Sequence, residues 1–173
     1  MAKFTGKQMN DIQNRKTSND VFSTPSGLVR ELLALTPCSL AQTVLDPFKG
    51  DGAFFNAFDH AGREWCEITE GRDFFEWTSN VDWVISNPPF SKLSPIITHT
   101  LSIAQEGFAY IMPTYSMTYR RLKEIEDAGF HMTSMVVFKN PKEWKIGFQM
   151  VYVVFERSRR VRTRTNDVVL LQS

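Results

Sequence analysis

The sequence predicts an α/β domain built on a mostly parallel sheet, and three features of the chain lead to this prediction. Segments rich in β-branched and aromatic residues alternate with amphipathic segments along most of the 173 residues, which is typical of βαβ units. This length suits one domain with a sizeable core. The last two strand-like segments, 132–138 and 148–156, have no helix between them, so we expect a hairpin and an antiparallel final strand.

Local signals place each element in turn. Thr24-Pro25 begins a helix, because proline is well tolerated in a first helical turn, and Pro37 ends it. Gly129 closes a later helix. The expected helices are 24–36, 53–62, 94–107 and 118–129, and the expected strands are 43–47, 64–68, 81–86, 108–113, 132–138 and 148–156. Residues 1–22 are expected to form a flexible segment, 23–157 the folded domain and 158–173 a basic tail.

Composition restricts the chemistry. The net charge is +1, so local basic patches would have to hold a nucleic-acid partner. Cys38 and Cys66 lie outside any CxxC or Cys/His cluster, so we expect no metal site. Both are expected to be buried free thiols, which fits a reducing, cytoplasmic location. No run approaches the ~18 apolar residues of a membrane span, so we expect no membrane association.

The segment DPFKGDG, 46–52, follows the strand 43–47. Open α/β sheets bind ligands beyond the carboxyl ends of their strands. Gly50 and Gly52 allow a tight turn and a close approach of the backbone to a ligand. The carboxylate of Asp46 could accept hydrogen bonds from an amino group. The alternative interpretation is a structural turn between a strand and a helix.

The segment SNPPF, 86–90, stands at the end of the strand 81–86. Pro88 and Pro89 fix the backbone and have no N–H, and their carbonyls can accept hydrogen bonds. The amide oxygen of Asn87 is a second acceptor, and an amine between these oxygens would be oriented by its own N–H donors. Phe90 offers a flat face on which a base could stack. Taken alone, the segment is explained equally well as a strand-ending turn.

Together, DPFxGxG and NPPF resemble the class I, Rossmann-like S-adenosylmethionine-dependent methyltransferases, specifically the N6-adenine branch. FSTPSGLVRELL, 22–33, resembles the segment that precedes the cofactor loop in the γ-type motif order. The resemblance implies a methyltransferase fold with a seven-stranded or reduced, mostly parallel sheet, an antiparallel final strand and helices on both faces. It also implies S-adenosylmethionine as cofactor, no metal, and methylation of adenine N6 in DNA, with RNA as the second choice.

The resemblance assigns roles to matching positions. Asn87, Pro88, Pro89 and Phe90 would form the catalytic loop, in which Asn87 Oδ1 and the Pro88 carbonyl accept the amino hydrogens. The residues expected around the cofactor are Thr24, Pro25, Asp46, Pro47, Phe48, Gly50, Gly52, Glu67, Asp73 and Phe74. For the ribose hydroxyls, Glu67 is preferred to Glu70 because it lies nearer the end of its strand. The short spacing from Glu70 to the catalytic strand implies that the usual helix and strand between them are shortened or absent.

Position and charge supply the candidates for substrate contacts. They are Phe90, Tyr115, Trp144, Lys145 and Arg157. The basic run 157–164 and the loop 139–147 could contact phosphates without reading sequence. The alternatives are a solvated charge run and a Trp144 that packs on the core. Little room remains for a target-recognition region, so a separate recognition subunit is an expected partner.

Other functions remain open from the sequence. NPPF-type loops also occur in methyltransferases that modify guanine N2 in RNA or glutamine side chains in proteins. A noncatalytic nucleic-acid-binding subunit of the same fold is an alternative from another class, although both loops are intact here. A nicotinamide dehydrogenase is disfavoured, because Phe55 occupies the third glycine position of GxGxxG.

Overall fold

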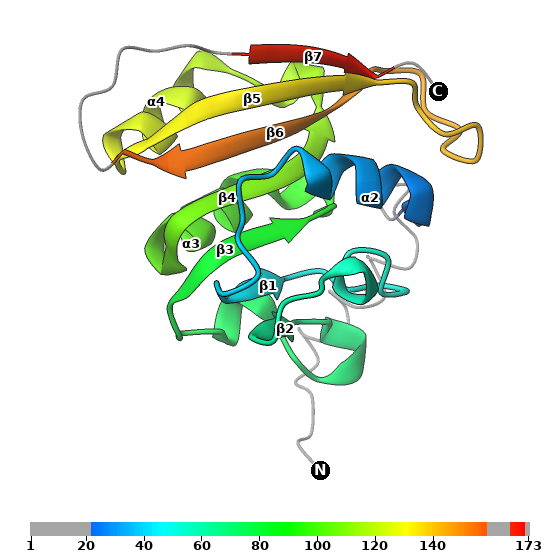
Figure 1. Cartoon of the computed structure of the whole chain (residues 1–173). Helices are drawn as coiled ribbons and strands as arrows, with labels where there is room; N and C mark the ends of the chain where they lie inside the picture. The colour runs from blue at the N-terminus through cyan, green and yellow to red at the C-terminus, as the bar shows by residue number, and fades with distance from the viewer. Residues whose placement is uncertain (1–21, 159–166, 172–173) are drawn as a thin grey trace, which may run out of the picture.

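A seven-stranded sheet with the order β2-β1-β3-β4-β6-β5-β7 forms the centre of the protein. The computed structural model describes residues 22–158 and 167–171 (Figure 1). The strands are β1 Val44–Asp46, β2 Arg63–Trp65, β3 Val81–Ser86, β4 Ala104–Pro113, β5 Phe130–Phe138, β6 Met150–Arg157 and β7 Asp167–Leu171. The predicted α/β class and the mostly parallel sheet are confirmed.

The antiparallel strand is β6, which pairs with β4 on one side and β5 on the other. The absence of a helix between 132–138 and 148–156 predicted that this strand would be antiparallel. β6 forms the expected hairpin with β5. It is not the last strand, however, because β7 follows it and runs parallel to β5. β7 lies within 158–173, where we expected a basic tail. Residues 159–166 of that segment lie outside the described residues.

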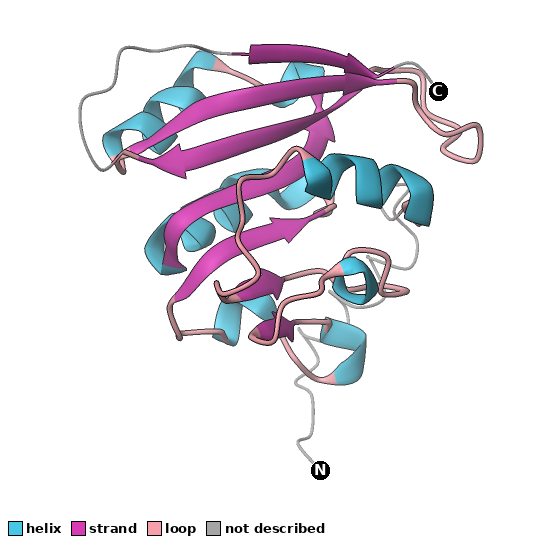
Figure 2. Cartoon of the chain, in the orientation of Figure 1, coloured by secondary structure: helices cyan, strands magenta, loops and turns pink. Residues whose placement is uncertain are grey.

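Helices cover both faces of the sheet, as expected. α2, Ser26–Ala34, lies in front of the sheet, and α3, Leu93–Ile103, and α4, Tyr119–Asp127, lie behind it (Figures 1 and 2). α2 turns Val29 and Leu32 into the core, which explains the apolar spacing of this segment. None of the described helices is long and apolar enough to cross a membrane.

The helix expected over 53–62 is wrong, because only a short 3-10 turn, η1, forms at Phe55–Ala57. The carboxylate of Asp46 accepts the backbone N–H of Phe55, and both Phe54 and Phe58 are buried in the core. The chain then enters β2 at Arg63. The hydrogen bond to Asp46 and the burial of both phenylalanines hold residues 54–58 in this short turn.

The boundary between α3 and β4 also differs from the expected one. α3 ends at Ile103, and residues 104–107, expected to be helical, begin β4 instead. Gly107 pairs with Trp83 of β3, and a Cβ on Gly107 would lie 2.6 Å from the Trp83 ring. A glycine here lets β4 pack against a large indole, which tertiary packing decides and helical periodicity does not show.

Between β2 and β3 the chain makes only two short 3-10 turns, η2 Ile68–Glu70 and η3 Phe74–Glu76. The expected shortening of this region is therefore confirmed. The first of these turns brings Glu67 and Glu70 into contact with the loop that follows β1.

Candidate functional site

The two motif loops leave the sheet at neighbouring strand ends. β1 and β3 pair in parallel, so DPFKGDG and NPPF emerge at the same edge. A hydrogen bond of 2.7 Å from Ser86 Oγ to Asp46 Oδ1 ties the two strand ends together. Sequence analysis gave Ser86 no role, although its place as the last strand residue before Asn87 was a signal. The sequence-predicted loops are thus brought together.

Asp46 is buried and organises the loop that follows it. Its carboxylate accepts hydrogen bonds from Phe48 N, Phe55 N and Ser86 Oγ. Burial raises the pKa of Asp46 to about 7, and the three hydrogen bonds offset this only in part. The carboxylate in this structure therefore holds the loop in shape, and its expected contact with a cofactor amino group stays a prediction.

The glycines of the loop adopt the backbone that only glycine takes readily. Gly50 has φ of 54° and Gly52 has φ of 89°. A Cβ on Gly50 would meet nothing closer than 3.9 Å, whereas one on Gly52 would lie 2.7 Å from Asn56 Nδ2. The backbone of Gly50 therefore leaves room for another group to approach. The missing side chain at Gly52 lets the chain pass close to Asn56.

Glu67 joins this loop to the end of β2. Its Oε2 accepts the backbone N–H of Gly50 at 3.0 Å, and its Oε1 accepts from Thr69 N and Thr69 Oγ1. Glu70, the alternative candidate, forms an ion pair with Lys49 at 2.7 Å. The structure thus places both acids at the loop, with Glu67 in direct contact with its backbone.

Asp73 and Phe74 lie at the start of η3. Asp73 Oδ1 accepts the N–H of Phe75, and the Phe74 ring is buried edge-on against Phe48 at 5.2 Å and His99 at 4.7 Å. Phe74 therefore connects the loop residue Phe48 to the core. The exposed ring in this turn is its neighbour, Phe75.

The amide of Asn87 is held on one side and free on the other. Nδ2 donates to the carbonyl of Phe22 and to Thr24 Oγ1, each at 3.2 Å. Oδ1 is buried and has no hydrogen-bond partner among the described residues. Thr24 is itself buried, and Pro25 caps α2 directly after it. Residues 22–25 thus lie against the NPPF loop and hold one end of the Asn87 amide, while its oxygen has no partner among the described residues.

Phe90 stacks on Phe22, with ring centroids 5.9 Å apart and an interplanar angle of 22°. It is 9% exposed, so one of its faces is already covered. Phe22 was expected to belong to a flexible segment, and the structure instead places it in the site. An aromatic residue two positions before the Thr-Pro helix start is the sequence signal for this contact.

Of the residues expected to contact the substrate, two are exposed and Trp144 is buried. Tyr115 is 65% exposed at the end of β4 and contacts Phe148 edge-on at 5.2 Å. Lys145 is exposed on the loop between β5 and β6. Trp144 is only 3% exposed, and its Nε1 donates to the carbonyl of Ser23, so it packs in the interior, which was the alternative interpretation.

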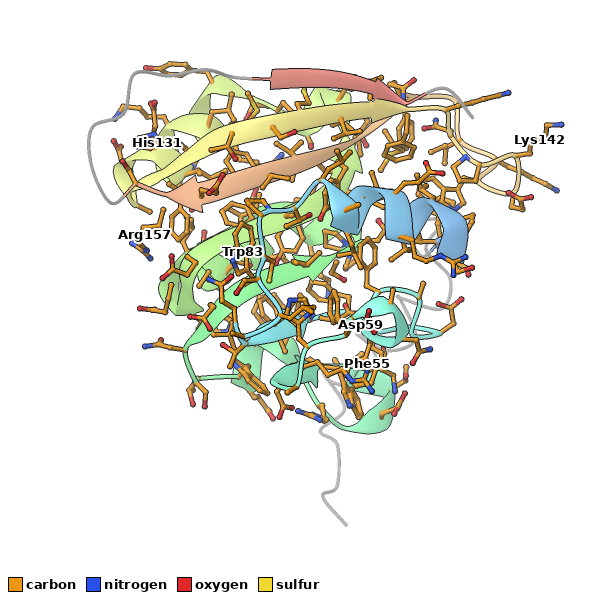
Figure 3. All side chains as sticks on the ribbon, in the orientation of Figure 1. Phe55, Asp59, Trp83, His131, Lys142 and Arg157 are labelled. Atoms are coloured by element: carbon orange, nitrogen blue, oxygen red, sulfur yellow. The ribbon has the colours of Figure 1, made fainter. Side chains whose placement is uncertain are left out.

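Arg157 does not lie at this edge. Its guanidinium donates to the carbonyls of Ala104, Gln105 and Ala128 and lies 4.2 Å from the Phe130 ring centroid. These groups belong to the starts of β4 and β5, at the amino end of the parallel strands. Figure 3 shows Arg157 and Lys142 at opposite ends of the sheet. Arg157 therefore connects the starts of β4 and β5 through hydrogen bonds and lies away from the motif loops.

Cys38 and Cys66 are free thiols, as expected, although Cys38 is only partly buried. Cys38 Sγ lies 3.1 Å from His60 Nε2. Within the described part of the chain, no group of three or more His, Cys, Asp or Glu side chains could hold a metal ion.

No family model matches this sequence, and no curated protein does. Solved structures do match. A candidate class I S-adenosylmethionine-dependent methyltransferase from Listeria monocytogenes superposes with a TM-score of 0.64 and 13% identity, covering 95% of this chain and 70% of the other. A candidate RNA methyltransferase from Pyrococcus horikoshii gives 0.63 and 20%, covering 92% and 100%.

A modification subunit of a candidate type I restriction enzyme from Vibrio vulnificus gives a TM-score of 0.59 at 14% identity, covering 87% of this chain and 47% of the other. Identities this low show the fold and not the substrate. The chain therefore has the fold of the class I S-adenosylmethionine-dependent methyltransferases.

Proposed function

We propose that this protein transfers a methyl group from S-adenosylmethionine to the N6 amine of adenine in DNA. The observation that carries the proposal is the Asn87 amide, whose Nδ2 is held by two acceptors while its Oδ1 is buried and unpaired among the described residues. An unpaired buried acceptor costs free energy, so a bound donor would stabilise it. An exocyclic amine between Asn87 Oδ1 and the Pro88 carbonyl is such a donor.

Two acceptors at the amine would make the N6 nitrogen of adenine a better nucleophile. The N6 lone pair is delocalised into the ring, and two fixed acceptors favour a pyramidal nitrogen whose lone pair is free. Positive charge develops on this nitrogen as the bond to the methyl carbon forms, and the preorganised oxygen of Asn87 stabilises it. The cofactor, when bound, supplies a methyl group already activated on a sulfonium. The amino proton is then lost to water.

The residues of the loop fit the proposed cofactor. Gly50 offers open backbone at the end of β1, and Glu67 fixes a carboxylate beside it. Gly50 N, Thr69 N and Thr69 Oγ1 take three of the roughly four acceptor positions of this carboxylate, which leaves about one for a ribose hydroxyl. Asp73 is held in place as the cap of η3. Pro25, Pro47, Phe48, Gly52 and Phe74 are proposed to shape the same pocket.

DNA is the first choice of substrate and RNA the second. The fold shared with a modification subunit of a candidate type I restriction enzyme supports DNA and a partner subunit. The fold shared with a candidate RNA methyltransferase, over that protein's full length, supports RNA. In a duplex the target base would have to leave the stack to reach Asn87. Tyr115 and Lys145, both exposed, are proposed to contact the nucleic acid near this site.

A methyl-transfer assay with labelled S-adenosylmethionine, run in parallel on DNA and RNA, tests the proposal. The nucleosides released by digestion are identified by mass. We expect N6-methyladenine in one polymer and a rate lower by ~10²–10³-fold in Asn87→Ala, as for other preorganised polar groups. Asn80→Ala, which removes an exposed asparagine before β3, is the matched control and should keep the wild-type rate.

Methylated guanine, or label on a protein glutamine, would replace adenine by another amine. No product on either polymer despite cofactor binding measured by calorimetry would contradict the proposed function. If the wild-type protein does not bind S-adenosylmethionine, the alternative function of a noncatalytic nucleic-acid-binding subunit is favoured.

A further inference from the structure

We infer that Thr24 is a positioning residue, which together with the Phe22 carbonyl sets the orientation of the Asn87 amide, and that Trp144 locks this arrangement. The inference rests on the proposed role of Asn87 and adds residues to which no catalytic part has been given. It reassigns Trp144 from a contact with the substrate to a support of the catalytic loop.

The first step is the orientation of the amide. An asparagine side chain can present either its oxygen or its nitrogen to an incoming amine, and only the oxygen can accept a hydrogen bond. Both neighbours of Nδ2, the Phe22 carbonyl and Thr24 Oγ1, can act as acceptors at 3.2 Å. The reversed amide would set its oxygen against the Phe22 carbonyl, which is unfavourable because both atoms only accept. The pair therefore selects the rotamer that leaves Oδ1 free.

The second step is what holds residues 22–24 in place. Trp144 Nε1 donates to the Ser23 carbonyl at 2.7 Å. The Trp144 ring lies 5.8 Å from the Phe22 ring, and Phe22 stacks on Phe90. Trp144 is buried against Phe138 of β5 as well. The contacts from Phe138 of β5 through Trp144 to Phe22 therefore fix the two acceptors of the Asn87 amide from outside the catalytic loop.

Three variants test the hold on the amide. Thr24→Val removes the acceptor at nearly constant volume, Thr24→Ser keeps it, and Trp144→Phe removes the indole N–H while keeping an aromatic ring. Two controls remove similar groups elsewhere. Thr100→Val deletes a buried hydroxyl bonded to Tyr110, and Trp83→Phe deletes a buried indole N–H that has no partner among the described residues.

The first readout is exchange of the Asn87 side-chain amide protons with solvent, measured by NMR. The signals are identified as the pair that disappears in Asn87→Ala. Wild type and Thr24→Ser should show slow exchange of both protons, and Thr24→Val should speed the exchange of one of them by tenfold or more. Equal exchange in the wild type and Thr24→Val would overturn the inference, whether or not the protein methylates adenine.

The second readout is the division between kcat and the Kd of S-adenosylmethionine. Thr24→Val should lower kcat about tenfold with the Kd changed less than twofold, Thr24→Ser should restore kcat, and Trp144→Phe should lower kcat by a smaller factor. The two controls should leave kcat unchanged even if the melting temperature falls. A loss in Thr24→Val that appears only in the Kd would make Thr24 a cofactor contact and overturn the positioning role. A wild type inactive on both polymers would refute the proposed function, while the exchange data would still decide the hold on the amide.

Discussion

Raising the pH is expected to destabilise this protein through Asp46. The carboxylate is 1% exposed, and its hydrogen-bond donors at Phe48, Phe55 and Ser86 are all neutral. Burial is the largest cause of a pKa raised from 3.8 to about 7, and the negative charge of Glu67 adds to it. No cation compensates among these contacts, so ionisation of Asp46 costs free energy in the folded state only.

The sign and size follow from proton linkage. In the unfolded chain the carboxyl titrates near 3.8, so between pH 4 and pH 7 the folded state binds more protons than the unfolded state. The free energy of unfolding therefore falls as the pH rises through this window. A difference of about three pKa units corresponds to about 4 kcal/mol, of which about 2 to 3 kcal/mol falls between pH 5 and pH 8.

Urea unfolding at pH 5, 6, 7 and 8 measures this directly. Asp46→Asn has no charge to titrate at this position, so its unfolding free energy should lack the fall attributed to Asp46, and the difference between the two profiles is the quantity compared. Asp59→Asn, which alters an exposed carboxylate, controls for a change of one charge and should follow the wild type. Parallel profiles for the wild type and Asp46→Asn would refute the reasoning.

Three further predictions concern packing, cofactor binding and the far end of the sheet. Gly107→Ala should lower the free energy of unfolding by roughly 1–3 kcal/mol, because its Cβ would lie 2.6 Å from the Trp83 ring; Gly147→Ala has open space, and equal losses in urea unfolding would contradict this. Glu67→Gln should weaken S-adenosylmethionine binding about tenfold in calorimetry, since an amide accepts less strongly than a carboxylate; an unchanged Kd would remove Glu67 from the site. Arg157→Gln should lower the free energy of unfolding by about 1 to 3 kcal/mol, because three carbonyls lose a charged donor. It should leave nucleic-acid affinity within about twofold at constant salt. Weaker nucleic-acid binding would place Arg157 in the interface.

Much of the fold could be predicted because its signals are local. The strand ending in Asp46 and the strand ending before Asn87 were recognisable from short apolar runs that stop at glycine or proline, and parallel strands place such ends at one edge. The missing signals were those that depend on packing. The segment 53–62 has a helical pattern, but Asp46 and the buried phenylalanines limit it to one short turn.

The two motif loops, their order and the hairpin that makes β6 antiparallel could be predicted from local sequence, because they depend on backbone chemistry and on the periodicity of neighbouring residues. Which atoms of those loops are left without a partner depends on contacts between residues that are far apart in the sequence. The Asn87 amide is oriented by Phe22 and Thr24, more than sixty residues earlier in the chain, and by Trp144 on a distant loop. Arg157, by contrast, was carried to the opposite end of the sheet by the direction of β6. Such outcomes depend on which strands pair and in which register, and the local sequence does not contain that information.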